Sequence, residues 1–238
     1  MGLKANKNIN PLPKNPIGRP QSLATTVAER LKDAIIRREL SLGESLSEEK
    51  VAVSMDVSRT PVREAFTILQ LQGLIDILPR RGSFVFKPDA HDLHLLVDYR
   101  LNLELLVSRM AAKRAPEATY SALRSAILAM DTARENDDAL GYANADTQFH
   151  NAFFENCGNQ FFIEAFDIAS GRIAALRAHL SAELGLHRHT TYQEHVLIAE
   201  AVREADLGEL GLAITRHISA MEPNYAQALE RLGQTGSV

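Results

Sequence analysis

More than half of the chain carries apolar residues only at helical spacing, which restricts this part to an all-helical bundle. From residue 90 to residue 232 no alternating or β-rich run interrupts the pattern. Glycine, proline and polar clusters end helices, so each such point is a predicted boundary. These boundaries are Ala115-Pro116, residues 136–138, Gly158-Asn159, Gly185 and residues 206–208. The sequence therefore predicts about six helices packed as a bundle.

The segment before this bundle has a different pattern, with three short helices followed by a hairpin. Helical periodicity begins at Ser22, a second helix is predicted from Ser47 to about Ser54, and a third starts at Ser58 and stops at Gly73. Two β-rich runs, residues 74–78 and 83–86, then flank a basic turn that contains glycine. The fold class is accordingly mainly α, a winged helix-turn-helix of three helices and a hairpin followed by the helical bundle.

Charge divides the chain in the same way. The net charge is −4, but residues 1–88 hold 14 Lys and Arg against 9 Asp and Glu, while the rest holds 12 against 21. A basic N-terminal third beside an acidic remainder is typical of a DNA-binding head on a sensing body. Chance segregation of surface charge is the alternative.

Four segments follow from these patterns. Residues 1–21 form a basic, proline-rich tail with no periodic pattern, and residues 22–88 form the winged helix-turn-helix. Residues 89–232 form the helical ligand-binding and dimerisation domain, and residues 233–238 form a short tail.

The start of the third helix has the residue types that read DNA. Arg59 and Arg63 lie four residues apart and share a helix face, and arginine is the best bidentate partner of guanine. Ser58 and Thr60 can hold phosphates at the helix start. On helix periodicity alone, a solvated helix face is the better explanation of two such arginines.

The hairpin tip supplies a second candidate contact with DNA. Arg80, Arg81 and Gly82 occupy the turn, and arginines in such a wing can enter the minor groove or grip phosphate.

A group of one aspartate and three histidines in the bundle could bind a metal. Asp146 and His150 stand at positions i and i+4 of one helix, His195 begins another helical stretch, and His217 lies on the last helix. This donor set suits zinc, with nickel or manganese as alternatives, and leaves positions open for water or a ligand. The chain has eight histidines, so such a set can also arise by chance.

The sequences of these motifs resemble those of a known family. Residues 22–87, above all the run from Val57 to Ala65 (VSRTPVREA) and the wing Arg80-Arg81-Gly82, closely resemble the winged-helix head of GntR-family regulators. The resemblance implies that Arg59 and Arg63 contact bases and that Gly82 lies near the minor groove. Some members carry a basic residue in the second helix that contacts DNA. The corresponding region here is Ser47-Glu48-Glu49-Lys50, so that contact is either missing or falls to Lys50.

Residues 90–232 are similar to the FCD ligand-binding domain of the FadR branch of this family. The similarity rests on Tyr99–Glu104, Asp146–His150, Gly158-Asn159, Glu194–Ile198 and Arg216-His217. It implies a divalent metal on Asp146, His150, His195 and His217. The expected number of helices resembles the VanR-like subgroup more than the seven-helix subgroup.

Arg100 is the candidate ligand-binding residue. The resemblance implies that its guanidinium faces the pocket, where it would bind a ligand carboxylate in a bidentate manner. The simpler explanation is a surface cation paired with Glu104 at i+4. His187 and His189 fall in a predicted loop and are interpreted as solvated.

Several classes are disfavoured. No apolar run approaches the length of a membrane span and residues 1–19 lack the apolar stretch of a signal peptide, so a cytoplasmic protein is expected. The single Cys157 excludes an internal disulfide and is interpreted as a buried bystander rather than a nucleophile.

The leading hypothesis is a repressor, acting as a homodimer on a pseudo-palindromic operator and controlled by a small carboxylic-acid effector. A metal-dependent hydrolase and an effector-independent DNA-binding protein are the alternatives.

Overall fold

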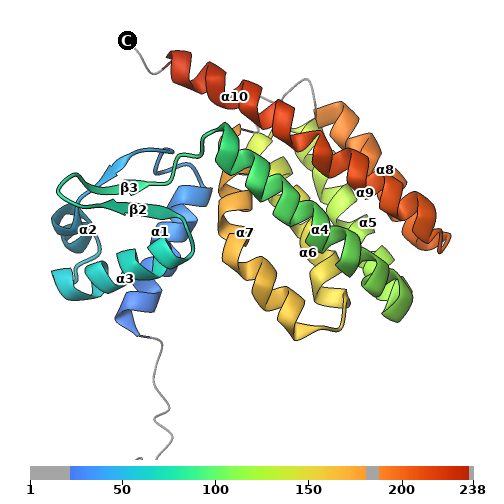
Figure 1. Ribbon diagram of the computed structural model, residues 1–238, viewed down its shortest axis with the longest axis horizontal. Coiled ribbons are helices and arrows are strands. Elements are labelled where there is room, and N and C mark those ends of the chain that lie inside the picture. The colour runs from blue at the N-terminus through green and yellow to red at the C-terminus, as the bar shows by residue number, and fades with distance from the viewer. Residues whose placement is uncertain (1–21, 181–187, 236–238) are drawn as a thin grey trace, which may run out of the picture.

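The computed structural model describes residues 22–180 and 188–235, and it has two parts (Figure 1). The first part, here called the head, contains α1 (Leu23–Ile36), β1 (Ser45–Leu46), α2 (Glu48–Ser54), α3 (Arg59–Leu71), β2 (Ile75–Leu78) and β3 (Gly82–Val85). The second part, here called the sensor, contains α4 (Ala90–Arg114), α5 (Pro116–Glu135), α6 (Ala139–Asn156), α7 (Gln160–Leu180), α8 (Arg188–Arg203), α9 (Leu207–Ser219) and α10 (Met221–Thr235). The predicted fold class is confirmed.

The head is held together by one apolar core under a small sheet. Leu31, Ile35, Phe66 and Leu69 are each at most 3% exposed, because α1 and α3 pack their apolar faces against each other. The strands pair antiparallel in the order β1-β3-β2. Strand β1 was not predicted, since a two-residue strand is too short to show alternation.

Capping fixes where the helices of the head begin. The Ser47 hydroxyl accepts a hydrogen bond of 3.4 Å from the Lys50 backbone N–H, as its position before α2 predicts. Ser58 occupies the N-cap position of α3, but its side chain makes no capping hydrogen bond. Its hydroxyl thus remains available at the exposed end of that helix.

The sensor is a bundle in which α4 lies across α6, α7 and α9 (Figure 1). Its centre is aromatic: Phe149 and Phe153 on α6 are fully buried and meet edge to face with ring centroids 6.0 Å apart. In the described part of the chain, none of the helices has the length and apolarity to cross a membrane.

The described residues of the sensor form seven helices, one more than the expected six. The extra boundary falls at Ala220, between α9 and α10. Pro223 is the cause, because proline has no N–H to continue the α9 ladder and is tolerated only in the first turn of a new helix. The similarity to the VanR-like subgroup rested on six helices and loses that support. The predicted boundary at Gly185, like His187, lies outside the described residues.

Head and sensor meet where α1 packs against α7. The turn after α3 lies at the same joint: Gly73 has φ of +66°, and a Cβ atom there would lie 2.8 Å from Cζ of Arg172 on α7. Glycine is therefore favoured at Gly73 by the left-handed backbone, whereas the contact with Arg172 involves the flexible end of a side chain, which can move.

We expect Gly73→Ala to lower the free energy of unfolding by about 1–3 kcal/mol, because alanine is strained at this positive φ. Urea denaturation measures the change. Gly211→Ala, inside α9 and near only the flexible end of Arg109, is the matched control and should not destabilise the protein. Equal unfolding midpoints for the two variants would contradict the preference for glycine at position 73.

Candidate functional site

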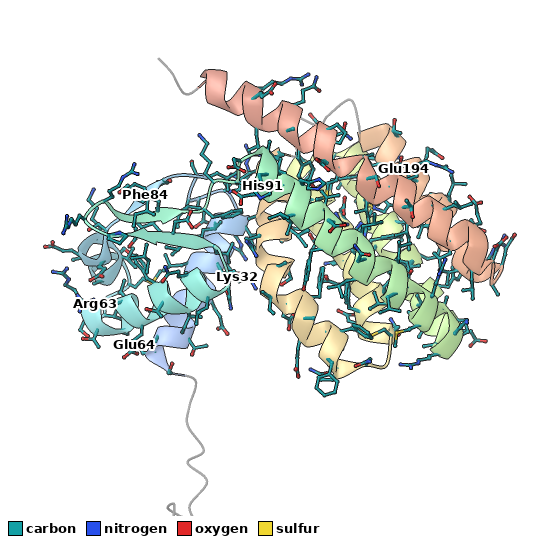
Figure 2. The ribbon with its side chains drawn as sticks, viewed as in Figure 1. Lys32, Arg63, Glu64, Phe84, His91 and Glu194 are labelled. Atoms are coloured by element: carbon teal, nitrogen blue, oxygen red, sulfur yellow. The ribbon has the colours of Figure 1, made fainter. Side chains whose placement is uncertain are left out.

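The N-terminal end of α3 presents its two arginines on the surface of the head. The side chains of Arg59 and Arg63 are 60% and 67% exposed, and Ser58 and Thr60 beside them are exposed as well. Figure 2 shows Arg63 at the outer edge of the head, far from the sensor. These four predicted residues thus form one surface at the start of the recognition helix.

Glu48, the first residue of α2, holds both arginines. Its carboxylate lies 3.5 Å from the Arg59 guanidinium and 3.0 Å from the Arg63 guanidinium. The hydrogen bond from Arg63 lowers the pKa of Glu48, so the carboxylate is ionised and orients the two cations. Sequence reasoning missed this role, because the pairing of α2 with α3 is a tertiary contact.

The wing extends from the same part. The turn between β2 and β3 carries Arg80, Arg81 and Gly82, all exposed, and Arg80 adopts a positive φ of 64°. The Arg81 N–H donates to the Leu78 carbonyl at 3.0 Å, which closes the turn. Lys50 on α2 is exposed.

In the sensor, the predicted metal ligands meet although they come from three helices. The ligand atoms of His150, His195 and His217 all lie within 4.8 Å of one another, and all three side chains are buried. Asp146 Oδ1 lies 3.3 Å from His150 Nε2 and 4.0 Å from His195 Nε2. Helices α6, α8 and α9 thus bring one carboxylate and three imidazoles to one point.

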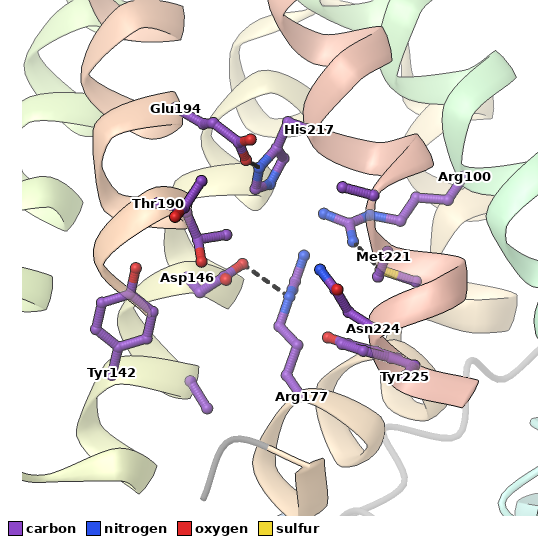
Figure 3. A pocket seen from close by; sticks show the side chains of 13 residues that line it. Arg100, Tyr142, Asp146, Arg177, Thr190, Glu194, His217, Met221, Asn224 and Tyr225 are labelled. Carbon is purple, nitrogen blue, oxygen red and sulfur yellow. Dashed lines mark hydrogen bonds and ion pairs between the residues drawn. The ribbon is translucent and has the colours of Figure 1, made fainter. Parts of the chain in front are cut away.

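Carboxylates on the far side of two of these rings fix which nitrogen faces inward. His150 Nδ1 is 2.5 Å from Glu104 Oε2. His217 Nδ1 is 2.8 Å from Glu194 Oε2, a pair that Figure 3 shows. When each Nδ1–H donates to its carboxylate, the Nε2 lone pairs of His150 and His217 face each other at 3.2 Å. Two facing lone pairs repel unless a cation lies near both, and carboxylate–histidine pairs are the usual second shell of a metal.

Burial keeps the imidazoles in the state that binds metals. It lowers the pKa of His195 well below its usual value, and it lowers the pKa of His217 to about 3, so both rings are neutral at physiological pH. Burial raises the pKa of Asp146, but the Arg177 guanidinium and the neighbouring histidines outweigh it and hold the pKa well below its usual value. Neutral imidazoles and an ionised carboxylate fit a divalent metal such as zinc.

Arg100 is buried, so its interpretation as a surface cation is wrong. It is 2% exposed, Glu104 is 0% exposed, and Arg100 Nε lies 2.5 Å from Glu104 Oε1. Burial raises the pKa of Glu104, but Arg100 and His150 outweigh it, so that the pKa falls below its usual value. Glu104 therefore stays ionised and joins the arginine to the histidine cluster.

Arg177 on α7 is a second buried cation that sequence reasoning missed. Its Nε lies 2.7 Å from Asp146 Oδ1, and its Nη1 donates to Thr147 Oγ1 at 3.2 Å. The Nη2 atoms of Arg177 and Arg100 are both buried without a hydrogen-bond partner among the described residues. Nothing in the local sequence distinguishes Arg177 from a surface arginine, since only the packing of α7 turns it inward.

These groups line a cavity of about 110 Å³, into which the Arg100 and Arg177 guanidiniums both point (Figure 3). Its other polar lining residues are Tyr142, Asp146, Thr190, Thr191, Glu194, His217, Asn224 and Tyr225. Burial raises the pKa of Tyr225 to about 12, so its phenol is a neutral donor. The cavity can bind an anion through two guanidiniums and hydroxyl groups through neutral side chains.

An exposed helix start with two arginines and a buried polar cavity are the arrangement expected of a ligand-responsive transcription regulator. Comparison with known proteins shows the family. Residues 23–85 match the family model "Bacterial regulatory proteins, gntR family", and residues 95–220 match the FCD domain. The chain therefore belongs to the GntR family of DNA-binding regulators and carries an FCD domain.

Named relatives align with about nine tenths of the chain. The transcriptional repressor NanR of Cronobacter sakazakii is 30% identical and is aligned over 92% of this chain and 91% of its own. NanR of Salmonella typhimurium is 28% identical over 90% and 88%. These relatives are transcriptional regulators, so the chain is a regulator and not an enzyme, and the hydrolase alternative is withdrawn.

Solved structures have the same fold. A GntR transcriptional regulator from Rhodococcus sp. RHA1 superposes with a TM-score of 0.77 at 25% identity, covering 86% of this chain and 98% of that one. McbR/YncC of E. coli gives a TM-score of 0.73 at 20% identity, covering 87% and 98%.

Arg59→Ala should abolish the preference for the operator and leave weak, salt-sensitive binding to any duplex, because a base contact is lost and the phosphate contacts remain. Operator affinity against a scrambled duplex at several salt concentrations measures this. Arg124→Ala, an exposed arginine on α5, is the control. Unchanged selectivity of Arg59→Ala would contradict base reading.

His195→Ala should remove bound zinc, since it deletes one imidazole from a cluster of three. Elemental analysis of the purified protein gives the metal content. The substitution also leaves a cavity, so the diagnostic quantity is the difference in melting temperature between zinc and chelator, which should vanish. The control is His91→Ala, at an exposed histidine, which should retain both the zinc content and the difference in melting temperature. Full zinc content in His195→Ala would remove the metal site.

Proposed function

We propose that this protein is a transcriptional repressor whose operator affinity is controlled by a small organic acid bound in the sensor cavity. The observation that carries the effector class is the pair of buried guanidiniums, each with an Nη2 atom that lacks a hydrogen-bond partner among the described residues. Unpaired buried donors are costly, and a carboxylate in the cavity would satisfy both. Repression is the activity in the name of the NanR relatives.

The cavity's polar lining narrows the effector further. Thr190, Asn224 and Tyr225 offer neutral hydrogen-bonding groups around the two arginines, which suits hydroxyl groups on the acid. We therefore place sugar acids, hydroxy acids and dicarboxylates in the effector class. Met221 and Ala220 contribute apolar contacts at the same wall.

A divalent metal, most simply zinc, belongs to the proposed site, with Asp146, His150, His195 and His217 as its ligands. When bound, the metal would act as a Lewis acid that holds an oxygen of the effector. The buried charges support an anion: Arg100 balances Glu104 and Arg177 balances Asp146, so a divalent ion would leave the site positive.

The head would read DNA as half of a homodimer. Two heads related by a two-fold axis would match a pseudo-palindromic operator, with Arg59 and Arg63 in the major groove and the wing arginines in the minor groove or on phosphate. A repressor of this kind would bind chromosomal DNA, so the proposed location is the cytoplasm. In this proposal, residues 22–88 read DNA and residues 89–232 bind the effector, as the sequence predicts.

Melting temperatures of the zinc-loaded protein with a panel of these acids test the proposal. An acid at 100 times its Kd should stabilise the protein by about 2.7 kcal/mol. Arg100→Lys should reduce the shift, because lysine keeps the charge beside Glu104 but loses the bidentate fork. Arg124→Lys on the surface is the matched control.

A second experiment tests whether the cavity controls DNA binding. Its probe is a DNA duplex that the protein selects from a random library. The acid that stabilises the protein should change the Kd for this duplex. If no acid stabilises the protein and none changes the Kd, the chain is the effector-independent DNA-binding protein of the alternative hypothesis.

A further inference from the structure

Helix α7 packs against α1 of the head (Figure 1). It also contributes Arg177 to the wall of the effector cavity. The helix continues from one to the other without a break, from Gln160 to Leu180. Its residue Arg177 lines the effector cavity, whereas Ile168, Ala169, Arg172 and Leu176 line a second cavity of about 380 Å³ at the joint with the head.

On the sensor side, α7 is tied to the proposed metal site. Arg177 Nε lies 2.7 Å from Asp146 Oδ1, the same oxygen that lies 3.3 Å from His150 Nε2. An effector carboxylate on Arg177, or a cation on Asp146, would therefore change the ion pair that holds α7 to α6. Arg177 is 4% exposed, so it has little room to respond without moving the helix.

On the head side, a buried hydrogen bond joins α7 to α1. His179 Nε2 donates to the Ile35 carbonyl at 2.8 Å, and His179 is only 8% exposed. Ile35 is the penultimate residue of α1 and belongs to the core of the head. A shift of α7 would therefore act directly on a rigid part of the head.

Close packing adds a second contact. Gly171 on α7 has no side chain, and a Cβ atom there would lie 3.0 Å from Leu74 Cδ1 and 3.2 Å from Lys32 Cε. Figure 2 shows Lys32 at the boundary between α1 and α7. Lys32 belongs to α1, which packs against the recognition helix α3, and Leu74 lies in the turn that follows α3. Helix α7 therefore contacts both the helix that packs on α3 and the turn at its end.

We propose that α7 is the element that couples the effector cavity to the DNA-binding head, with His179 and Gly171 as its contacts on the head. The proposal rests on the proposed function for its ligand but makes a separate claim about the route of coupling. Helix α4 provides the covalent connection through residues 86–89, whereas α7 provides the packed one. A helix with one face in each part transmits a small displacement as a rigid body.

A double-mutant cycle on operator binding tests this route without any effector. The four proteins are the wild type, Arg177→Lys, His179→Leu and the double variant, and the probe is the duplex selected from the random library. We expect Arg177→Lys to change the Kd by about fivefold or more in the wild-type background, the usual lower range of allosteric coupling. In the His179→Leu background the same substitution should change the Kd less than about twofold.

His179→Gln is the conservative control, because its side-chain amide can still donate to the Ile35 carbonyl, and it should restore the response to Arg177→Lys. An equal effect of Arg177→Lys in all backgrounds, or no effect in the wild type, overturns the proposal. An acid that changes operator affinity as strongly in His179→Leu as in the wild type also overturns it, while leaving the proposed function intact.

Hydrogen–deuterium exchange on the unmodified protein covers the case that a variant fails to fold. The probe is zinc ion alone, added to metal-depleted protein. Slower exchange is expected in peptides covering residues 31–36 and 71–75 of the head, in addition to the sensor cavity. The wing tip, residues 79–82, should not change. Protection confined to the sensor overturns the proposal.

Discussion

The sensor depends on the buried carboxylate of Glu104. It accepts from Arg100 on its own helix and faces His150 of α6, so one side chain fixes both the arginine proposed to bind the ligand and the first histidine of the cluster. Two buried charges are expensive to desolvate, and removing one partner of such a pair typically costs about 3–5 kcal/mol. Pairs of this kind seldom add net stability, so their value here lies in holding the walls of the cavity in one geometry.

The same geometry explains why the cavity suits an anion. Arg177 and Asp146 repeat the arrangement of Arg100 and Glu104 on the opposite wall, and each arginine uses only part of its donor fork on its carboxylate. The remaining donors are already oriented by these pairs, so a ligand carboxylate would bind with little reorganisation of the side chains. A cavity prepared in this way can respond to a small ligand with a defined change in a few contacts.

Sequence could predict what local pattern encodes. Helical periodicity gave the bundle, the run from Ser58 to Ala65 gave the recognition helix, and the i, i+4 spacing of Asp146 and His150 gave half of the cluster. It missed Glu48 and Arg177, because their roles arise only when α2 meets α3 and α7 meets α6. It also missed the start of α10, since a proline in the first turn of a helix looks the same as one that disrupts it.

Arginine–glutamate pairs occur in both the head and the sensor, and burial gives the two cases opposite consequences. Glu48 contacts Arg59 and Arg63 at the surface of the head, where water and salt screen the charges and the pairs are weak. Those guanidiniums can exchange the carboxylate for guanine or phosphate at little cost, as a DNA-reading surface requires. Glu104 and Arg100 meet in the interior, where no such exchange is possible without leaving a charge unpaired. The head is thus built to release its arginines, and the sensor is built to keep them in place.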